Sequence, residues 1–69
     1  MLREACQSSN IKSFGYDQDQ QILEVEFVGG SMYQYLDVSQ DIYDSFLLAD
    51  SKGKFFYQNI RNQYRFQKV

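Results

Sequence analysis

Residues 22–37, ILEVEFVGGSMYQYLD, decide the fold. The first half of this stretch alternates between apolar and acidic side chains, in the order Leu23, Glu24, Val25, Glu26 and Phe27. A period of two is typical of a strand with one buried and one solvated face. Gly29-Gly30 then reverses the chain into a further strand over Met32–Asp37. The stretch therefore predicts an antiparallel β-hairpin.

The register of this hairpin decides where Tyr33 and Tyr35 lie. If the loop is Gly29-Gly30 alone, both tyrosines share the solvated face with the glutamates, where they form a platform for stacking bases at about 1–3 kcal/mol per base. If the loop also contains Val28, with the second glycine as a left-handed bulge residue, both tyrosines face the apolar residues of the first strand. The second register is favoured because it groups more apolar area on one face. The exposed platform stays open as the alternative.

The segments around the hairpin complete an α+β pattern. Ile11–Tyr16 is predicted to be a strand, and the polar run 17–20 a turn. After the hairpin, the apolar spacing predicts one helix from a cap at Asp37 or Ser39 to residues 50–51, and a second from Ser51 or Lys52 to Tyr64. The order β-β-β-α-α predicts a three-stranded antiparallel meander followed by two helices packed on one face.

The length of 69 residues leaves room for one domain, 1–69. Its first nine residues are expected to be loosely ordered, or to form a short helical turn. Arg65–Val69 is expected to be a short strand or an extended end. A single cysteine excludes an internal disulfide, so six Phe and six Tyr, or dimerisation, have to compensate for the small core.

The composition argues against catalysis and cofactor binding. There is no histidine, which removes the commonest transition-metal ligand and the usual general base. Cys6 has no histidine to activate it as a nucleophile. Glu24 and Glu26 are typical of a solvated strand face, and Gly29-Gly30 leads into a strand, unlike a phosphate-binding loop. The sequence therefore predicts no catalytic residue, no metal site and no cofactor.

The N-terminal residues and the hydropathy predict a cytoplasmic location. No run approaches the ~20 apolar residues that span a bilayer. The N-terminal sequence MLREACQSSN contains Glu4 and has no apolar core of a secretory signal. A lone cysteine fits a reducing compartment. We expect no membrane partner.

The charge is strongly polarised along the chain. Residues 1–50 hold all nine acidic residues and two basic ones, a net charge of −7, whereas 51–69 have a net charge of +5. The five cations are Lys52, Lys54, Arg61, Arg65 and Lys68. Lys54 and Arg61 are seven residues apart and are expected to share a helix face. With aromatic neighbours in the same segment, this is the pattern of a modest phosphate-contacting surface.

A family resemblance extends over nearly the whole chain from Ser9 onward. Its motifs are Gly15-Tyr16-Asp17, Leu23-x-Val25-x-Phe27, Gly30-x-x-Tyr33-x-Tyr35, Tyr43, Ala49-x-Ser51-x-Gly53, Phe55-Phe56, and Ile60 followed by Tyr64. In their order and spacing these motifs resemble the KTSC domain family. That family is named for its occurrence at the C-terminus of some lysyl-tRNA synthetases, and it also occurs as free-standing small bacterial proteins.

The resemblance implies a binding module for which RNA has been suggested as the ligand. The chain departs from the family at three positions. Ser39 stands where members often have Pro, Tyr57 where they often have Asn, and Arg65 where they often have Pro. If that Asn carries the family's function, the function is not inherited here.

Two hypotheses follow. The first is a non-catalytic module that contacts structured RNA, such as tRNA, through the basic segment 52–68. The second is a protein-interaction module, in its simplest form a homodimer or an accessory subunit. The small core, the surplus of aromatic residues and the opposite charges of the two parts of the chain favour this second hypothesis.

Overall fold

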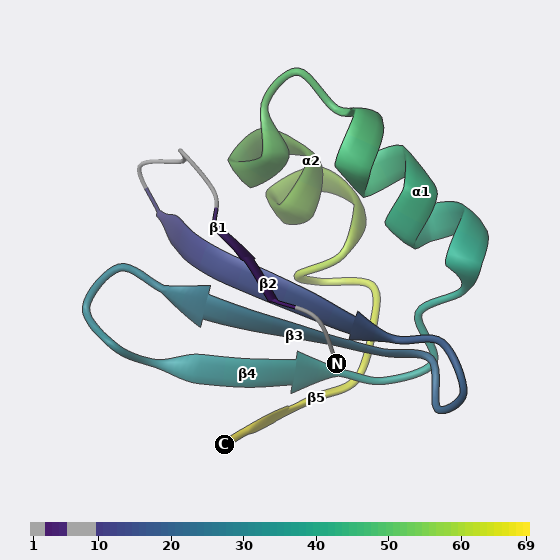
Figure 1. Ribbon diagram of the computed structural model, residues 1–69, viewed down its shortest axis with the longest axis horizontal. Helices are drawn as coiled ribbons and strands as arrows, with labels where there is room; N and C mark the ends of the chain where they lie inside the picture. The colour runs from purple at the N-terminus through teal and green to yellow at the C-terminus, as the bar shows by residue number, and fades with distance from the viewer. Residues whose placement is uncertain (1–2, 6–9) are drawn as a thin grey trace.

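The computed structural model describes residues 3–5 and 10–69, which form an antiparallel sheet with two helices over one face (Figure 1). The elements are β1 (Arg3–Ala5), β2 (Ile11–Asp17), β3 (Ile22–Phe27), β4 (Met32–Tyr35), α1 (Gln40–Leu48), α2 (Lys52–Asn59) and β5 (Phe66–Lys68). The strands lie side by side in sequence order. The predicted α+β class and its meander are confirmed, and the sheet gains one strand at each edge.

The hairpin adopts the longer-loop register. Val25 lies opposite Tyr33, and Leu23 lies opposite Tyr35. The loop closes where the Phe27 amide donates to the Ser31 carbonyl oxygen, at 2.8 Å. Both loop glycines have positive φ angles, 109° and 97°, which residues other than glycine rarely adopt. The tyrosines therefore lie on the helix-covered face, and the alternative of an exposed platform beside the glutamates is wrong.

The two edge strands come from the chain ends. Arg3–Ala5 pairs with β2, so these three residues are neither loosely ordered nor helical. The remaining residues expected to be loosely ordered, 1–2 and 6–9 with Cys6, lie outside the described residues. At the other edge, Phe66–Lys68 pairs with β4 and resolves the alternatives for the tail in favour of a strand. Pairing satisfies the backbone groups of β4 that would otherwise face solvent.

Of the two caps predicted for α1, Asp37 and Ser39, the structure has Ser39. The Ser39 hydroxyl accepts the amide of Ile42, and Asp41 lies in the first turn, where a negative charge suits the helix dipole. The helix is slightly shorter than predicted and ends at Leu48. Its buried face centres on Phe46, which is fully enclosed.

The helix α2 is shorter than predicted, because it ends at Asn59 instead of Tyr64. The Asn59 side chain donates to the Phe55 carbonyl oxygen, and the amides of Ile60 and Arg61 both donate to that of Phe56. Ile60 remains fully buried while the chain turns back towards the sheet. The Leu36 amide, which donates to the Arg65 carbonyl oxygen at 2.8 Å, fixes this return. The local spacing predicted more helix, but the pairing of β5 with β4 ends it earlier.

The core lies between the sheet and the two helices. Its fully or nearly buried apolar members are Ile11, Phe14, Tyr16, Leu23, Val25, Tyr35, Val38, Phe46, Phe56 and Ile60. Under α1 the rings close over one another, with Phe14 edge-on to Phe46 at 4.9 Å between centroids and Tyr16 stacked on Tyr43 at 4.3 Å. The Tyr16 hydroxyl donates to the carbonyl oxygen of Val38. The rings in this part of the core therefore pack against one another.

Candidate functional site

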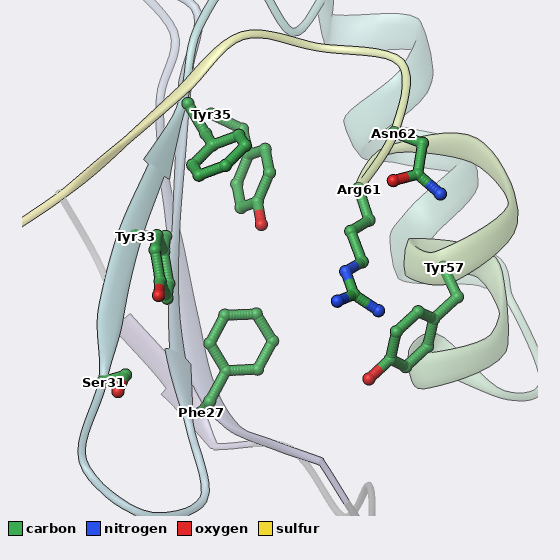
Figure 2. Close-up of a pocket in the computed structure, with 8 residues that line it drawn as sticks. Phe27, Ser31, Tyr33, Tyr35, Tyr57, Arg61 and Asn62 are labelled. Atoms are coloured by element: carbon green, nitrogen blue, oxygen red, sulfur yellow. The ribbon is translucent and has the colours of Figure 1, made fainter.

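A groove of about 430 Å³ opens between α2 and the strands β4 and β5. Five aromatic rings line it, those of Phe27, Tyr33, Tyr35, Tyr57 and Phe66. Three polar residues complete the lining, namely Ser31, Arg61 and Asn62. Figure 2 shows the two walls, with Tyr33, Tyr35 and Phe27 on the sheet side and Tyr57, Arg61 and Asn62 on the helix side.

The sheet wall is a row of mutually supported rings. Tyr33 is edge-on to Phe27 at 5.6 Å and to Phe66 at 5.7 Å. Tyr35 contacts Phe66 at 5.5 Å and Phe56 of α2 at 5.1 Å. The strand register produces this row, because residues directly opposite on neighbouring strands share a face, and Tyr35 lies opposite Phe66. Phe66 is 56% exposed although two tyrosine rings support it, so its free surface faces a ligand or solvent.

The helix wall combines a ring with a cation. The Arg61 guanidinium lies 4.8 Å from the centroid of the Tyr57 ring, a cation–π contact. The Tyr57 hydroxyl also accepts a hydrogen bond from the Asn10 side chain, at 3.4 Å. These contacts orient Arg61 across the mouth of the groove, where Figure 2 shows its guanidinium between Tyr57 and the sheet wall. Arg61 reaches this position because α2 ends before it.

The electrostatic character of the groove is positive. None of the described lining residues is acidic, although the whole chain has a net charge of −2. Lys68 lies opposite Tyr33 on the same sheet face, which adds a second cation beside the groove. Burial raises the pKa of Tyr35, and the Arg61 charge partly opposes that rise. Tyr35 is therefore a neutral hydrogen-bonding group at physiological pH.

The predicted basic segment does not form one surface. Arg61 and Lys68 flank the groove, together with the predicted residues Tyr33 and Tyr35. Lys52 lies apart, because its ammonium group donates to the Leu47 carbonyl oxygen at the end of α1, at 3.2 Å.

The other two predicted cations, Lys54 and Arg65, are exposed and do not line the groove. Lys54 lies in the first turn of α2, one helical turn before Tyr57. The predicted helix face shared by Lys54 and Arg61 is wrong, since Arg61 lies beyond the end of α2.

The carboxylates of the sheet are occupied by hydrogen bonds on the face away from the helices. Glu26 accepts from the Ser13 hydroxyl at 2.9 Å, and Glu24 accepts from the Gln34 amide at 3.0 Å. Within residues 3–5 and 10–69, no cluster of three potential ligands could hold a metal ion. No helix in that part of the chain is long and apolar enough to cross a membrane.

Five lining residues were not predicted as site residues, namely Phe27, Ser31, Tyr57, Asn62 and Phe66. Phe27 was predicted only as core, and its position at the bulged end of the β2–β3 ladder leaves it half-buried at the groove. Ser31 and Asn62 carry no sequence signal of their own. Asn62 becomes a groove residue only because α2 ends early. The aromatic character of Tyr57 and Phe66 was visible, but their convergence depended on the β4–β5 pairing.

Comparison with known proteins agrees with the fold and with the motifs. The family model of the KTSC domain matches residues 7–64. An uncharacterised protein of Stutzerimonas stutzeri (strain A1501) is 46% identical over all of this chain and 99% of its own length. A lysine–tRNA ligase of Nostoc punctiforme is 35% identical over 91% of this chain, which corresponds to 11% of the ligase.

A solved structure has the same architecture. The crystal structure of a KTSC domain protein from Yersinia pestis is 39% identical, with a TM-score of 0.91 over 99% of this chain and 96% of that one. The family match, the sequence relatives and this structure cover almost all of the described residues. The chain therefore belongs to the KTSC domain family.

Proposed function

We propose that this protein is a non-catalytic module that binds RNA, with the groove between α2 and β4–β5 as its binding site. One observation carries the proposal. Five aromatic rings and the Arg61 guanidinium converge on a cavity whose described lining contains no carboxylate, in a chain that is acidic as a whole.

The chemistry of the groove matches the way proteins hold RNA. Unstacked bases bind on aromatic rings and on the plane of an arginine guanidinium, and lysine and arginine contact the phosphates. Tyr33, Tyr57 and Phe66 supply the rings, and Arg61 and Lys68 supply the charge. Ser31 and Asn62 supply hydrogen-bonding groups for a base edge or a ribose.

The relatives support tRNA as the first RNA to test. The lysine–tRNA ligase of Nostoc punctiforme carries a segment 35% identical to this chain. The free-standing relative in Stutzerimonas stutzeri shows that the domain also exists without a ligase attached. A binding role fits both settings, because a module of this kind adds RNA contacts to whatever carries it.

The absence of a catalytic role is part of the proposal. The chain has no histidine. The paired carboxylates Glu24 and Glu26 accept hydrogen bonds from Gln34 and Ser13 on the sheet face away from the groove. We also expect the protein in the cytoplasm, where tRNA is found, in keeping with its lone cysteine.

An NMR titration of isotope-labelled protein with bulk tRNA tests the proposal. At low salt we expect backbone amide shifts to cluster at residues 57–68 and to disappear as salt is added. Arg61→Gln should weaken binding, whereas the matched variant Lys12→Gln, which removes an exposed cation from β2, should not. A flat titration, or equal effects of the two variants, would contradict RNA binding at this groove.

A homodimer is the second candidate, and β5 favours it. No described strand pairs with the outer edge of β5, and Phe66 and Val69 are exposed there at 56% and 66%. Two such edges can pair across a two-fold axis. Sedimentation velocity from micromolar to millimolar concentration tests this. A monomer throughout would exclude the dimer, and a dimer abolished by Lys68→Pro, which removes an outward-facing N–H of β5, would support it.

A further inference from the structure

We infer that the groove takes a single unpaired nucleotide, with its base against Phe66, so that the ligand is single-stranded RNA and not an RNA helix. This inference rests on the proposed function and specifies the class of RNA. It comes from three features of the groove, namely its size, the limited positive charge around it and the exposed face of one ring.

The size of the groove fits one nucleotide. At about 430 Å³ it lies at the lower end of the range of about 300–1,000 Å³ for small-ligand sites. Its two walls face each other across an open mouth, with Tyr57 and Arg61 opposite Tyr33 (Figure 2). A base that remains paired and stacked in a helix has no free face to place between two such walls. An unpaired base has two free faces, one for each wall.

The charge around the groove is too limited for an RNA helix. Helical RNA is recognised through phosphates and ribose hydroxyls spread over successive grooves. Of the described cations, Arg61 alone lines the groove and Lys68 lies beside it, and the longest dimension of the molecule is 27 Å. The sheet face away from the helices presents Glu24 and Glu26, which repel phosphate. Two cations suffice for the one or two phosphates that flank an unpaired base.

Phe66 provides the stacking surface. Tyr33 meets it edge-on at 72° and Tyr35 lies tilted at 36°, so two rings hold Phe66 in position. More than half of Phe66 nevertheless stays exposed. A ring that is fixed and uncovered loses little conformational freedom when a base stacks on it. Asn62 on the opposite wall can donate and accept hydrogen bonds at the edge of that base.

Fluorescence anisotropy with short labelled RNAs tests this inference. The probes are single-stranded hexamers of adenylate and of uridylate, and a closed RNA hairpin with a helical stem of matched phosphate count. We expect at least one single-stranded probe to bind about ten-fold or more tightly than the stem at the same salt concentration. We expect Phe66→Leu to weaken single-stranded binding by roughly five-fold to 150-fold, the range for stacking of one base on a ring.

The control variant is Leu48→Ala, which removes an 84% exposed apolar side chain at the end of α1, away from the groove. It should leave binding unchanged. Phe66→Leu keeps an apolar residue in β5, and an unchanged unfolding midpoint will verify that the fold is intact. If the variant unfolds, Arg61→Lys takes its place, since lysine keeps the charge but has no planar group to stack.

The outcomes separate this inference from the proposed function. Equal affinity for stem and single strand, or single-stranded binding that Phe66→Leu leaves intact while Arg61→Gln weakens it, would overturn the inference and keep RNA binding. Failure of every probe and of bulk tRNA to bind would overturn the proposed function, and the inference with it.

Discussion

The two helices cover the same sheet with different completeness. Under α1, the closed half, the rings of Phe14, Tyr16, Tyr43 and Phe46 pack on one another. Under α2, the open half, the rings of Tyr33, Tyr57 and Phe66 face a groove. Both halves draw on the same dense supply of aromatic residues. The comparison therefore shows that aromatic content alone does not distinguish a core from a binding site.

The geometry of α2 explains the difference. The helix ends at Asn59 so that the chain can return to pair with β4, and the fully buried hydrophobic side chains of this region are Phe56 and Ile60. The strand β5 then extends the sheet beyond the reach of the helix. The rings on that extension, above all Phe66, have support from one side only. The open half exists because the sheet extends further than the helix that covers it.

The largest effect should come from a truncation in the closed half. Phe46→Ala should reduce the free energy of unfolding by about 3–5 kcal/mol, because it removes a fully buried ring. Phe66→Ala in the open half should cost about 1 kcal/mol, since much of that ring is already in water. Urea unfolding followed by circular dichroism measures both. Similar losses at the two positions would remove the distinction between the halves.

The next effect concerns the charge of the open half. Arg61→Gln should weaken RNA binding and lower the slope of log affinity against log salt by about 1, the change expected for one lost phosphate contact. Lys52→Gln is the matched variant, because Lys52 lies at the other end of α2, where it donates to the Leu47 carbonyl oxygen and does not line the groove. Its slope should stay near that of the unaltered protein. The measurement is anisotropy from about 50 to 200 mM salt.

A smaller effect should follow from the hairpin that sets the register. Gly30 has a φ of 97°, and a Cβ placed there meets nothing within 4 Å. Gly30→Ala should therefore cost about 1 kcal/mol through backbone strain alone. Hydrogen exchange should show faster opening of β4 amides with little change in β2. Equal acceleration in both strands would mean that the two halves unfold as one unit.

The smallest effect should appear in alkaline solution. Burial raises the pKa of Tyr16 above its ordinary value of 10.0, with added contributions from Asp44 and Asp17. The folded state thus keeps the Tyr16 proton when the unfolded state loses it. Stability should be unaffected below pH 10 and should fall as pH rises above that value.

The raised pKa of Tyr35 acts in the same direction, with Arg61 opposing it in part. Denaturant unfolding between neutral and strongly alkaline pH is measured for the unaltered protein and for Tyr16→Phe. The difference between the two gives the part of the alkaline loss of stability that comes from Tyr16 in the closed half. A steeper decline in Tyr16→Phe than in the unaltered protein would contradict this assignment.

The fold was largely predictable because its decisive signals are local. The alternation at Leu23, Val25 and Phe27, together with the glycine pair, predicted the hairpin and favoured its observed register. The capping residues Asp37 and Ser39 predicted the start of α1 to within two residues, and Ser39 is the cap. The end of α2 was not predictable in this way, since the spacing of Phe56, Ile60 and Tyr64 continues the helical pattern. Pairing with β4, a contact between distant segments, ended it.

The site was less predictable for the same reason. The basic segment was visible in the sequence, but only Arg61 and Lys68 flank the groove. Ser31 and Asn62 acquire their place from the loop before β4 and from the turn after α2. The strand β1 was missed because three residues without alternation give no strand signal, and its pairing with β2 alone defines it.

The most direct test of the account is a set of intermolecular nuclear Overhauser effects between labelled protein and a short single-stranded RNA. We expect contacts from base protons to the rings of Phe66 and Tyr57 in the open half. We expect none to the rings of Tyr16 and Tyr43 in the closed half. Binding that gives amide shifts but places the base protons on the Glu24 and Glu26 face, or near Lys52, would contradict the account.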